Sequence, residues 1–202
     1  MAETSTGVEP RSESELATAA LRFARRVHLG QHRKQTHEQF VEHPIAVARL
    51  LADAGFEGRI IVAAYLHDVV EKTKVESDEI RERFGEQVSS VVDALTEDPT
   101  LSGYAERKRA LRRQVLGAGQ APVLIYAADR VANLRDWRTV PPEGREEVAG
   151  RLDTTLAERL RLWNEDLEEL TRLDPELPFL AELELELRAL LSDARGARPE
   201  TP

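Results

Sequence analysis

A histidine and two acidic residues stand close together at the end of an apolar segment. His67 and Asp68 are adjacent, and Glu71 follows four residues after His67. On a helix, residues that are one, three or four positions apart can reach a common point from one face. These three side chains could therefore hold a metal ion and move a proton beside it. The alternative is a core helix that turns polar where it leaves the interior.

Two further residues favour the metal site. His43 stands directly before Pro44 at an expected helix start, and Asp129 follows the apolar segment "VLIYAA". A carboxylate is costly to bury unless it is paired or bound to a metal. Together, His43, His67, Asp68 and Asp129 would offer one ion two imidazoles and two carboxylates. That set suits a divalent transition metal with coordination positions left for water.

The composition limits the classes of cofactor and ligand. None of the 202 residues is cysteine, which excludes disulfides, thiolate catalysis and cysteine-bound zinc. The net charge of −9 argues against a nucleic-acid polymer as partner. The locally basic residues 22–34 favour a small anionic ligand instead. No apolar run approaches the ~18 residues of a membrane span, and no signal-peptide pattern is present, so we expect a cytoplasmic protein without a membrane partner.

Helices are expected to position the candidate residues. A capping box of Ser12 and Glu15 predicts a first helix that runs to about residue 29. A second helix should have Pro44 in its first turn and Gly55 at its end. The apolar residues 58–70 are expected to form one buried helix, because the segment contains alanines and no partner strand is evident.

The rest of the chain also favours helices. They are expected at 77–84, 86–95, 104–116 and from Pro122 to about 137, and two long ones at about 142–172 and 176–194. The "LELEL" of 183–187 alternates like a strand, but its leucines also keep helical spacing. The predicted fold is therefore all-α, with roughly eight or more helices in a single domain over 13–194. The polar tails 1–12 and 195–202 are expected to be disordered.

Several short motifs occur in a fixed order along the chain. They are "VHLGQHRK" from Val27, "HPIAVA" from His43, "AAYLHDVVEKT" from Ala63, "FGEQVSSVVDALT" from Phe84 and "ADRVANLRD" from Ala128. This order resembles the HD phosphohydrolase superfamily, and especially the RelA/SpoT hydrolase domain and its small stand-alone alarmone hydrolases. The resemblance covers roughly residues 16–150. It implies an HD-domain helical bundle that removes the 3′-diphosphate from guanosine tetra- or pentaphosphate, using Mn²⁺.

The resemblance also implies roles for individual residues. It makes His43, His67, Asp68 and Asp129 the metal ligands, and Glu71 the catalytic acid that helps to activate the attacking water.

The resemblance further places residues around the substrate. Arg33 falls where an arginine packs on the purine, a cation–π role. Lys34, Arg130 and Asn133 fall at positions that line the nucleotide pocket. Tyr126 and Trp137 are most simply interpreted as core residues.

Lys72 is the clearest departure from the family pattern. The family has a Glu-Asp pair where this chain has Glu71-Lys72, so a cation replaces one carboxylate. Lys72 would then act in catalysis through direct contact with a phosphate, or it would change the choice of substrate. The alternative is that Lys72 points outward and pairs with Asp68 or Glu76 at helical spacing.

Three functions follow from these observations. The first is an alarmone hydrolase, and the second is an HD hydrolase of another nucleotide or phosphorylated metabolite. The third is a non-catalytic nucleotide-binding domain that signals through its acidic C-terminal helices. The four ligands and Glu71 favour an enzyme with a small anionic nucleotide as substrate. Mn²⁺ is the expected metal, with other divalent ions as alternatives, and the sequence predicts no oligomeric state.

Overall fold

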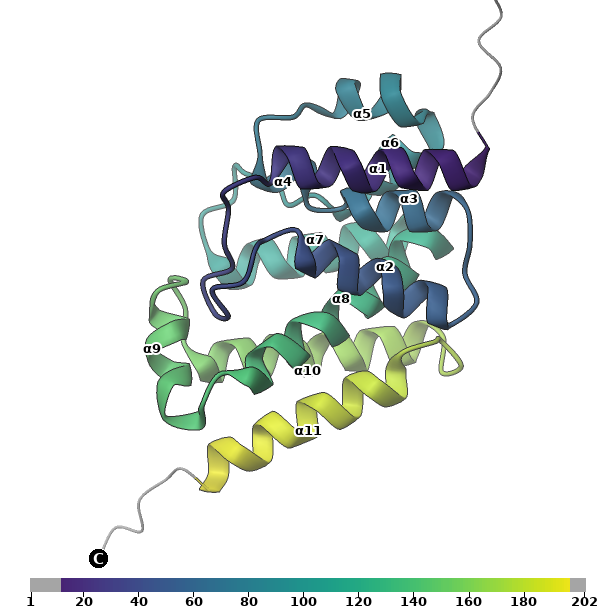
Figure 1. Cartoon of the computed structure of the whole chain (residues 1–202). Coiled ribbons are helices and arrows are strands. Elements are labelled where there is room, and N and C mark those ends of the chain that lie inside the picture. The colour runs from purple at the N-terminus through teal and green to yellow at the C-terminus, as the bar shows by residue number, and fades with distance from the viewer. Residues whose placement is uncertain (1–11, 197–202) are drawn as a thin grey trace, which may run out of the picture.

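The computed structural model describes residues 12–196, and over this range the chain is a bundle of eleven α-helices and one 3-10 helix (Figure 1). The helices are α1 (Glu13–Val27), α2 (Glu42–Asp53), α3 (Arg59–Leu66), α4 (Val69–Lys72), α5 (Ser77–Phe84), α6 (Glu86–Leu95), α7 (Tyr104–Gly117), α8 (Gln120–Thr139), η1 (Pro142–Gly144), α9 (Arg145–Gly150), α10 (Leu156–Leu173) and α11 (Leu180–Gly196). The extended pairing found among the described residues is one isolated bridge, His32 with Gln39. The all-α prediction is confirmed.

Helix α8 runs through the middle of the bundle and carries much of the core (Figure 1). It packs against α2, α3, α6 and α7 and also against α10 and α11. Its residues from Pro122 to Ala132 are all buried, which is typical of a helix packed among others. Two residues of this buried segment, Asp129 and Arg130, are charged. The central helix therefore places one negative and one positive side chain in the interior of the bundle.

Local sequence signals fix several helix ends. Ser12 accepts a hydrogen bond from the backbone N–H of Glu15, and the Glu15 carboxylate accepts one from the backbone of Ser12, as the capping box predicts. Gly55 follows α2 with φ of +85°, a conformation that favours glycine. Gly85 separates α5 from α6 with φ of +89°. Both of these short helices have the predicted bounds.

The predicted helix over 58–70 is wrong in one respect, because it is interrupted. The chain turns at His67 and Asp68, between α3 and α4. His67 Nδ1 lies 2.8 Å from the carbonyl oxygen of Ala64. In a continuous helix that carbonyl would accept from the amide of Asp68, so the imidazole competes with the backbone ladder. The interruption places two candidate ligands, His67 and Asp68, in the turn between the two helices.

The predicted helix over 142–172 is also wrong, because the structure divides it into η1, α9 and α10. Asp153 lies between α9 and α10 with φ of +54°, in the left-handed region. Thr155 then starts α10, and its Oγ1 accepts from the backbone N–H of Glu158 at 3.1 Å. A threonine cap of this kind marks a new helix start.

Helix α11 covers one side of α8 and α10 (Figure 1). Leu183, Leu187 and Leu190 are all buried, so helical rather than alternating spacing describes the "LELEL" segment. The helix extends to Gly196, and Ser12 belongs to the cap of α1. The remainder of the predicted disordered tails lies outside the described residues. None of the described helices has both the length and the apolarity of a membrane span.

Glu165 on α10 should make the stability of the bundle depend on acid pH. Its carboxylate accepts hydrogen bonds from Arg109 and Arg112 of α7, and the contact with Arg109 is foremost in lowering its pKa from 4.5 to about 2. A lowered folded-state pKa stabilises the protein above the unfolded value, and this contribution is lost as the pH falls from 4.5 toward 2.

We therefore expect Glu165→Gln to lower the free energy of unfolding by about 1 kcal/mol at pH 6, since the pair is partly exposed. The difference from the parent protein should shrink steadily below pH 4.5. Urea unfolding of both proteins between pH 6 and pH 3 measures this difference. A difference that stays constant across the range would show that the charge of Glu165 has no part in it.

Candidate active site

Three buried residues from distant segments meet around one point. His43 comes from the first turn of α2, His67 from the turn after α3, and Asp129 from the middle of α8. His43 Nε2 lies 2.8 Å from Asp129 Oδ1, and His67 Nε2 lies 3.6 Å from the same oxygen. One ligand atom from each residue falls within 4.8 Å of the others. The group has the chemistry and spacing that could hold a metal ion.

Asp68 adds a second carboxylate to this group. Its Oδ2 lies 3.8 Å from His43 Nε2 and 3.6 Å from His67 Nε2. All four predicted ligands therefore face the same small space. Asp68 is less buried than the other three, although all four line the same cavity.

The contacts of His67 test whether a metal ion fits. Its Nδ1 faces the carbonyl oxygen of Ala64, which accepts only, so this nitrogen must carry a proton. Its Nε2 is buried and has no hydrogen-bond partner. A ligating histidine usually donates from one ring nitrogen to a carbonyl and offers the other to the metal. The orientation of His67 agrees with that role.

The two carboxylates govern the charge of this site. Burial lowers the pKa of His67, but the charges of Asp68 and Asp129 outweigh it and raise the pKa to about 9. The pKa of Asp68 is lowered to about 2, because the nearby imidazoles overcome the effect of burial. In neutral solution a metal ion would therefore replace a proton on His67 Nε2, and its affinity should rise with pH.

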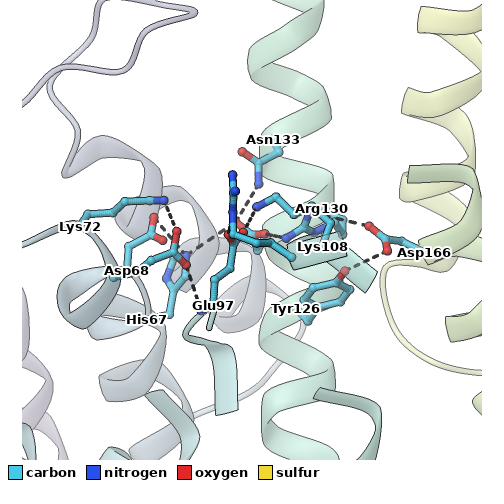
Figure 2. Close-up of polar contacts among 12 residues, drawn as sticks. His67, Asp68, Lys72, Glu97, Lys108, Tyr126, Arg130, Asn133 and Asp166 are labelled. Carbon is cyan, nitrogen blue, oxygen red and sulfur yellow. Dashed lines mark hydrogen bonds and ion pairs between the residues drawn. The ribbon is translucent and has the colours of Figure 1, made fainter. Parts of the chain in front are cut away.

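Glu71 and Lys72 lie beside the ligands, at the end of α4. The Lys72 ammonium donates a hydrogen bond to the Glu71 carboxylate, and Lys72 lies on the same side of the site as Asp68 (Figure 2). Glu71 also accepts from the backbone N–H of Glu97 at 3.4 Å. The predicted pairing of Lys72 with Asp68 or Glu76 is not the contact that forms. Lys72 lines the cavity instead of pointing away from it.

A cavity of about 590 Å³ opens from His43, His67, Asp68 and Asp129, which are called the ligand group below. This volume is within the usual range for small-molecule sites. Its walls include the four candidate ligands, Glu71 and Lys72 from α4, and the predicted nucleotide-binding residues Arg33, Lys34, Arg130 and Asn133. The sequence-predicted site residues are therefore brought together in one place.

Arg33 is held against α8 by polar contacts. Its guanidinium lies 2.7 Å from Asn133 Oδ1 and 2.8 Å from Asp136 Oδ2. It also lies over the ring of Phe40, 5.8 Å from the centroid. Asn133 in turn donates to Asp129 Oδ1 at 2.8 Å. A chain of contacts thus connects Arg33 to Asp129 of the ligand group.

Lys34 and Arg130 differ in their surroundings. Lys34 is exposed and donates to the backbone carbonyl of Arg151 at 3.2 Å. Arg130 is buried over the ring of Tyr126, and its Nη2 lies 2.8 Å from Asp129 Oδ2. Arg130 therefore fixes the second oxygen of a candidate ligand, which makes it a positioning residue as well as part of the wall.

The sequence did not reveal the contribution of α10 to the site. Asp166 accepts a hydrogen bond from Tyr126 at 2.9 Å and lies 3.7 Å from Arg130 (Figure 2). Arg159 lines the cavity from the first turn of the same helix. Tyr126 and Trp137 are buried, as predicted, but they also line the cavity. The signal available in the sequence was the position of Asp166 at helical spacing from Trp163 and Leu170, which places an acid on the apolar face of an amphipathic helix.

Glu97 is a further residue of the wall without a predicted role. It is half-enclosed between Arg107, whose Nε lies 3.0 Å away, and Lys108, which donates to its other oxygen. Figure 2 shows Glu97 and Lys108 near the ligand group. The cavity therefore contains more cations than acids outside the ligand group, which suits an anionic ligand.

Comparison with known proteins decides the family. A model of the HD domain matches residues 20–163. The chain belongs to the HD-domain family. The matched segment includes all four candidate ligands, and it ends within α10.

Two animal HD-domain relatives are similar to the chain over most of their length. The human guanosine-3′,5′-bis(diphosphate) 3′-pyrophosphohydrolase MESH1 is 39% identical over 139 residues, covering 67% of this chain and 77% of that protein. The corresponding Xenopus tropicalis protein is 36% identical over the same shares. An Aquifex aeolicus enzyme of the same activity is 32% identical over 150 residues. This match covers 72% of the chain but only 21% of the longer Aquifex enzyme.

Solved HD-domain structures share the fold. A metazoan ortholog of SpoT that hydrolyzes ppGpp has a TM-score of 0.69 and 27% identity, covering 94% of this chain and 98% of that one. A Listeria monocytogenes protein has a TM-score of 0.67 and 28% identity, covering 78% and 98%. The α10 and α11 helices therefore have counterparts in at least the first of these structures.

Proposed function

We propose that the chain is a metal-dependent hydrolase that removes the 3′-diphosphate from guanosine tetra- or pentaphosphate. The observation that carries this proposal is the convergence of His43, His67, Asp68 and Asp129, with His67 Nε2 unpartnered. The activity for which the animal relatives are named supports the same substrate, and the chain matches these relatives over 77% of their length.

These four residues are proposed to hold the metal, with Mn²⁺ the expected ion. Two imidazoles and two carboxylates suit a divalent transition metal, and the chain has no cysteine thiolate that would favour a softer metal. When bound, the ion would lower the pKa of an attacking water and neutralise phosphate charge.

Glu71 is proposed to take the proton of the attacking water. It lines the cavity beside the ligand group, and a carboxylate at that position can act as general base. The water oxygen forms a bond to the phosphorus next to the 3′ oxygen, and the bond between that phosphorus and the 3′ oxygen breaks. Pyrophosphate is released and the 3′ oxygen receives a proton. Guanosine diphosphate remains from the tetraphosphate, and guanosine triphosphate from the pentaphosphate.

The other wall residues are proposed to orient the nucleotide. Arg33 presents the guanidinium face that could pack on a purine, and Asn133 keeps it in place. Lys34 and Arg130 contribute positive charge along the wall. Lys72 is proposed to contact a phosphate oxygen once substrate separates it from Glu71. The cell compartment expected for this chemistry is the cytoplasm.

The direct test is hydrolysis by the purified protein. With Mn²⁺ it should release one pyrophosphate for each guanosine diphosphate formed from guanosine 3′,5′-bis(diphosphate). Glu71→Gln should lower the rate by about 100-fold or more, because general bases contribute on that scale. Protein that is folded and metal-loaded, yet leaves this nucleotide intact, would rule out the substrate.

Lys72 also supports a second candidate, an HD hydrolase for another nucleotide or phosphorylated metabolite. Under the proposed function, Lys72→Met should lower kcat/KM for guanosine tetraphosphate by about 10-fold or more, since charge-assisted contacts are lost. Lys74→Met is the matched control, because Lys74 is an exposed lysine two residues further on. A gain of this activity on Lys72→Asp would favour the second candidate, and a metabolite screen would then identify its substrate.

A further inference from the structure

Arg159, in the first turn of α10, is a buried cation without an acidic partner. It is 9% exposed, and its Nε has no hydrogen-bond partner. No ion pair of its guanidinium occurs among the described residues. The other buried arginines of the described chain each pair with a carboxylate, and they are Arg33, Arg112, Arg130 and Arg145. A buried charge without a counter-charge is costly, so its retention here needs a reason.

The surroundings of Arg159 leave its charge facing the cavity. The guanidinium lies 4.7 Å from the ring centroid of Tyr104 and 5.1 Å from that of Trp137, and it lines the cavity wall. The adjacent acid, Glu158, is engaged elsewhere, because its carboxylate accepts from Thr154 at 2.7 Å. Two aromatic rings thus orient Arg159 but cannot neutralise it.

The position of Arg159 separates it from the ligand group. Trp137 follows Asp129 by eight residues on α8, which is about 12 Å along the helix axis. Burial is foremost in lowering the pKa of Arg159, and the charges of Arg130 and Arg33 oppose the raising effects of Tyr104 and Glu158. Arg33 and Arg130 each pair with a carboxylate, so Arg159 is the described buried arginine of this cavity whose charge is left for an anion.

We propose that Arg159 is a substrate-binding residue that receives a second phosphate group, one that is not hydrolysed. The inference rests on the proposed function, and in guanosine tetraphosphate this group is the 5′-diphosphate. Its oxygens would supply the counter-charge that the protein lacks, through charge-assisted hydrogen bonds. Specificity for a nucleotide with two anionic ends would then follow from two separate parts of one cavity.

Titration with guanosine diphosphate and guanosine tests the proposal in Mn²⁺-loaded protein. The diphosphate should bind more tightly than guanosine. Arg159→Gln should weaken the binding of guanosine diphosphate by about 10- to 100-fold and leave the affinity for guanosine unchanged. Arg161→Gln, which changes an arginine on the same helix with a side chain 57% exposed, should change neither affinity. Equal weakening of both ligands, or no weakening of the diphosphate, would overturn the proposal.

Stability separates binding from a structural role. Arg159→Met keeps a long side chain against the two rings and removes the uncompensated charge, so the unfolding midpoint should stay the same or rise. If the unfolding midpoint of Arg159→Met clearly falls, and the variant loses affinity for guanosine diphosphate and for guanosine to the same extent, Arg159 has a structural role and the proposal is contradicted.

The outcome is also distinct from that of the hydrolysis test. If guanosine tetraphosphate is not hydrolysed, but diphosphate affinity depends on Arg159, the phosphate subsite stands and the proposed reaction falls. If guanosine tetraphosphate is hydrolysed, but the affinity for guanosine diphosphate does not depend on Arg159, the proposed reaction stands and the phosphate subsite falls.

Discussion

Replacement of His67 by alanine is expected to abolish hydrolysis by removing the metal. His67 Nδ1 is fixed by the Ala64 carbonyl, and its Nε2 faces Asp68 and Asp129 without a hydrogen-bond partner. Changes to residues that only support metal ligands cost about 10- to 100-fold in affinity. Loss of a ligand itself should exceed that, so His67→Ala should bind Mn²⁺ more than about 100-fold less tightly. Calorimetric titration and the pyrophosphate assay measure the two losses.

His37→Asn is the matched control for this variant. His37 is an exposed loop histidine with φ of +60°, a conformation that asparagine also adopts. It should keep both metal affinity and activity. If His67→Ala is folded and retains both as well, the ligand group is not the metal site of this enzyme.

Replacement of Asp166 by asparagine is expected to cause the largest loss of stability. The Asp166 carboxylate is 2% exposed, lies 2.9 Å from Arg112 Nε, and is near Arg130. It also accepts from Tyr126. Without it, two buried guanidiniums lose a shared counter-charge, and removal of one partner from a buried pair costs about 3–5 kcal/mol. Urea unfolding at neutral pH measures this loss.

Glu165→Gln provides the comparison, because Glu165 is the neighbouring acid and pairs with two arginines near the surface. Its expected loss is only about 1 kcal/mol. A loss for Asp166→Asn no larger than this would show that Asp166 does not hold the buried charges together. Loss of Asp166 should also reduce activity, since Arg130 joins it to Asp129.

The sequence predicted the ligand group because its residues fall within short local motifs. His43 and Asp129 stand out beside apolar segments, and their helices begin and end at Pro and Gly signals that act locally. The turn at His67 was not predictable in this way. It depends on a side chain that competes for a backbone carbonyl, and helical spacing describes the residues on both sides equally well.

The residues of α10 show the limit of local patterns more clearly. Asp166 and Arg159 have roles only because α10 packs near α7 and α8, and their partners lie between 22 and 55 positions away in the sequence. The contact of Lys72 with Glu71 likewise depends on the short α4 helix, which ends at Lys72, so that Glu76 is not at helical spacing from Lys72. Tertiary packing therefore determines these contacts, whereas the motifs along the sequence are sufficient to predict the candidate ligands.

Hydrolysis of guanosine 3′,5′-bis(diphosphate) in ¹⁸O-labelled water tests the central claim most directly. If the residues at this site direct water onto the phosphorus next to the 3′ oxygen, mass spectrometry will find one label in pyrophosphate and none in guanosine diphosphate. The signal should disappear in Glu71→Gln and in His67→Ala. Label in guanosine diphosphate, or release of single phosphates instead of pyrophosphate, would contradict the account.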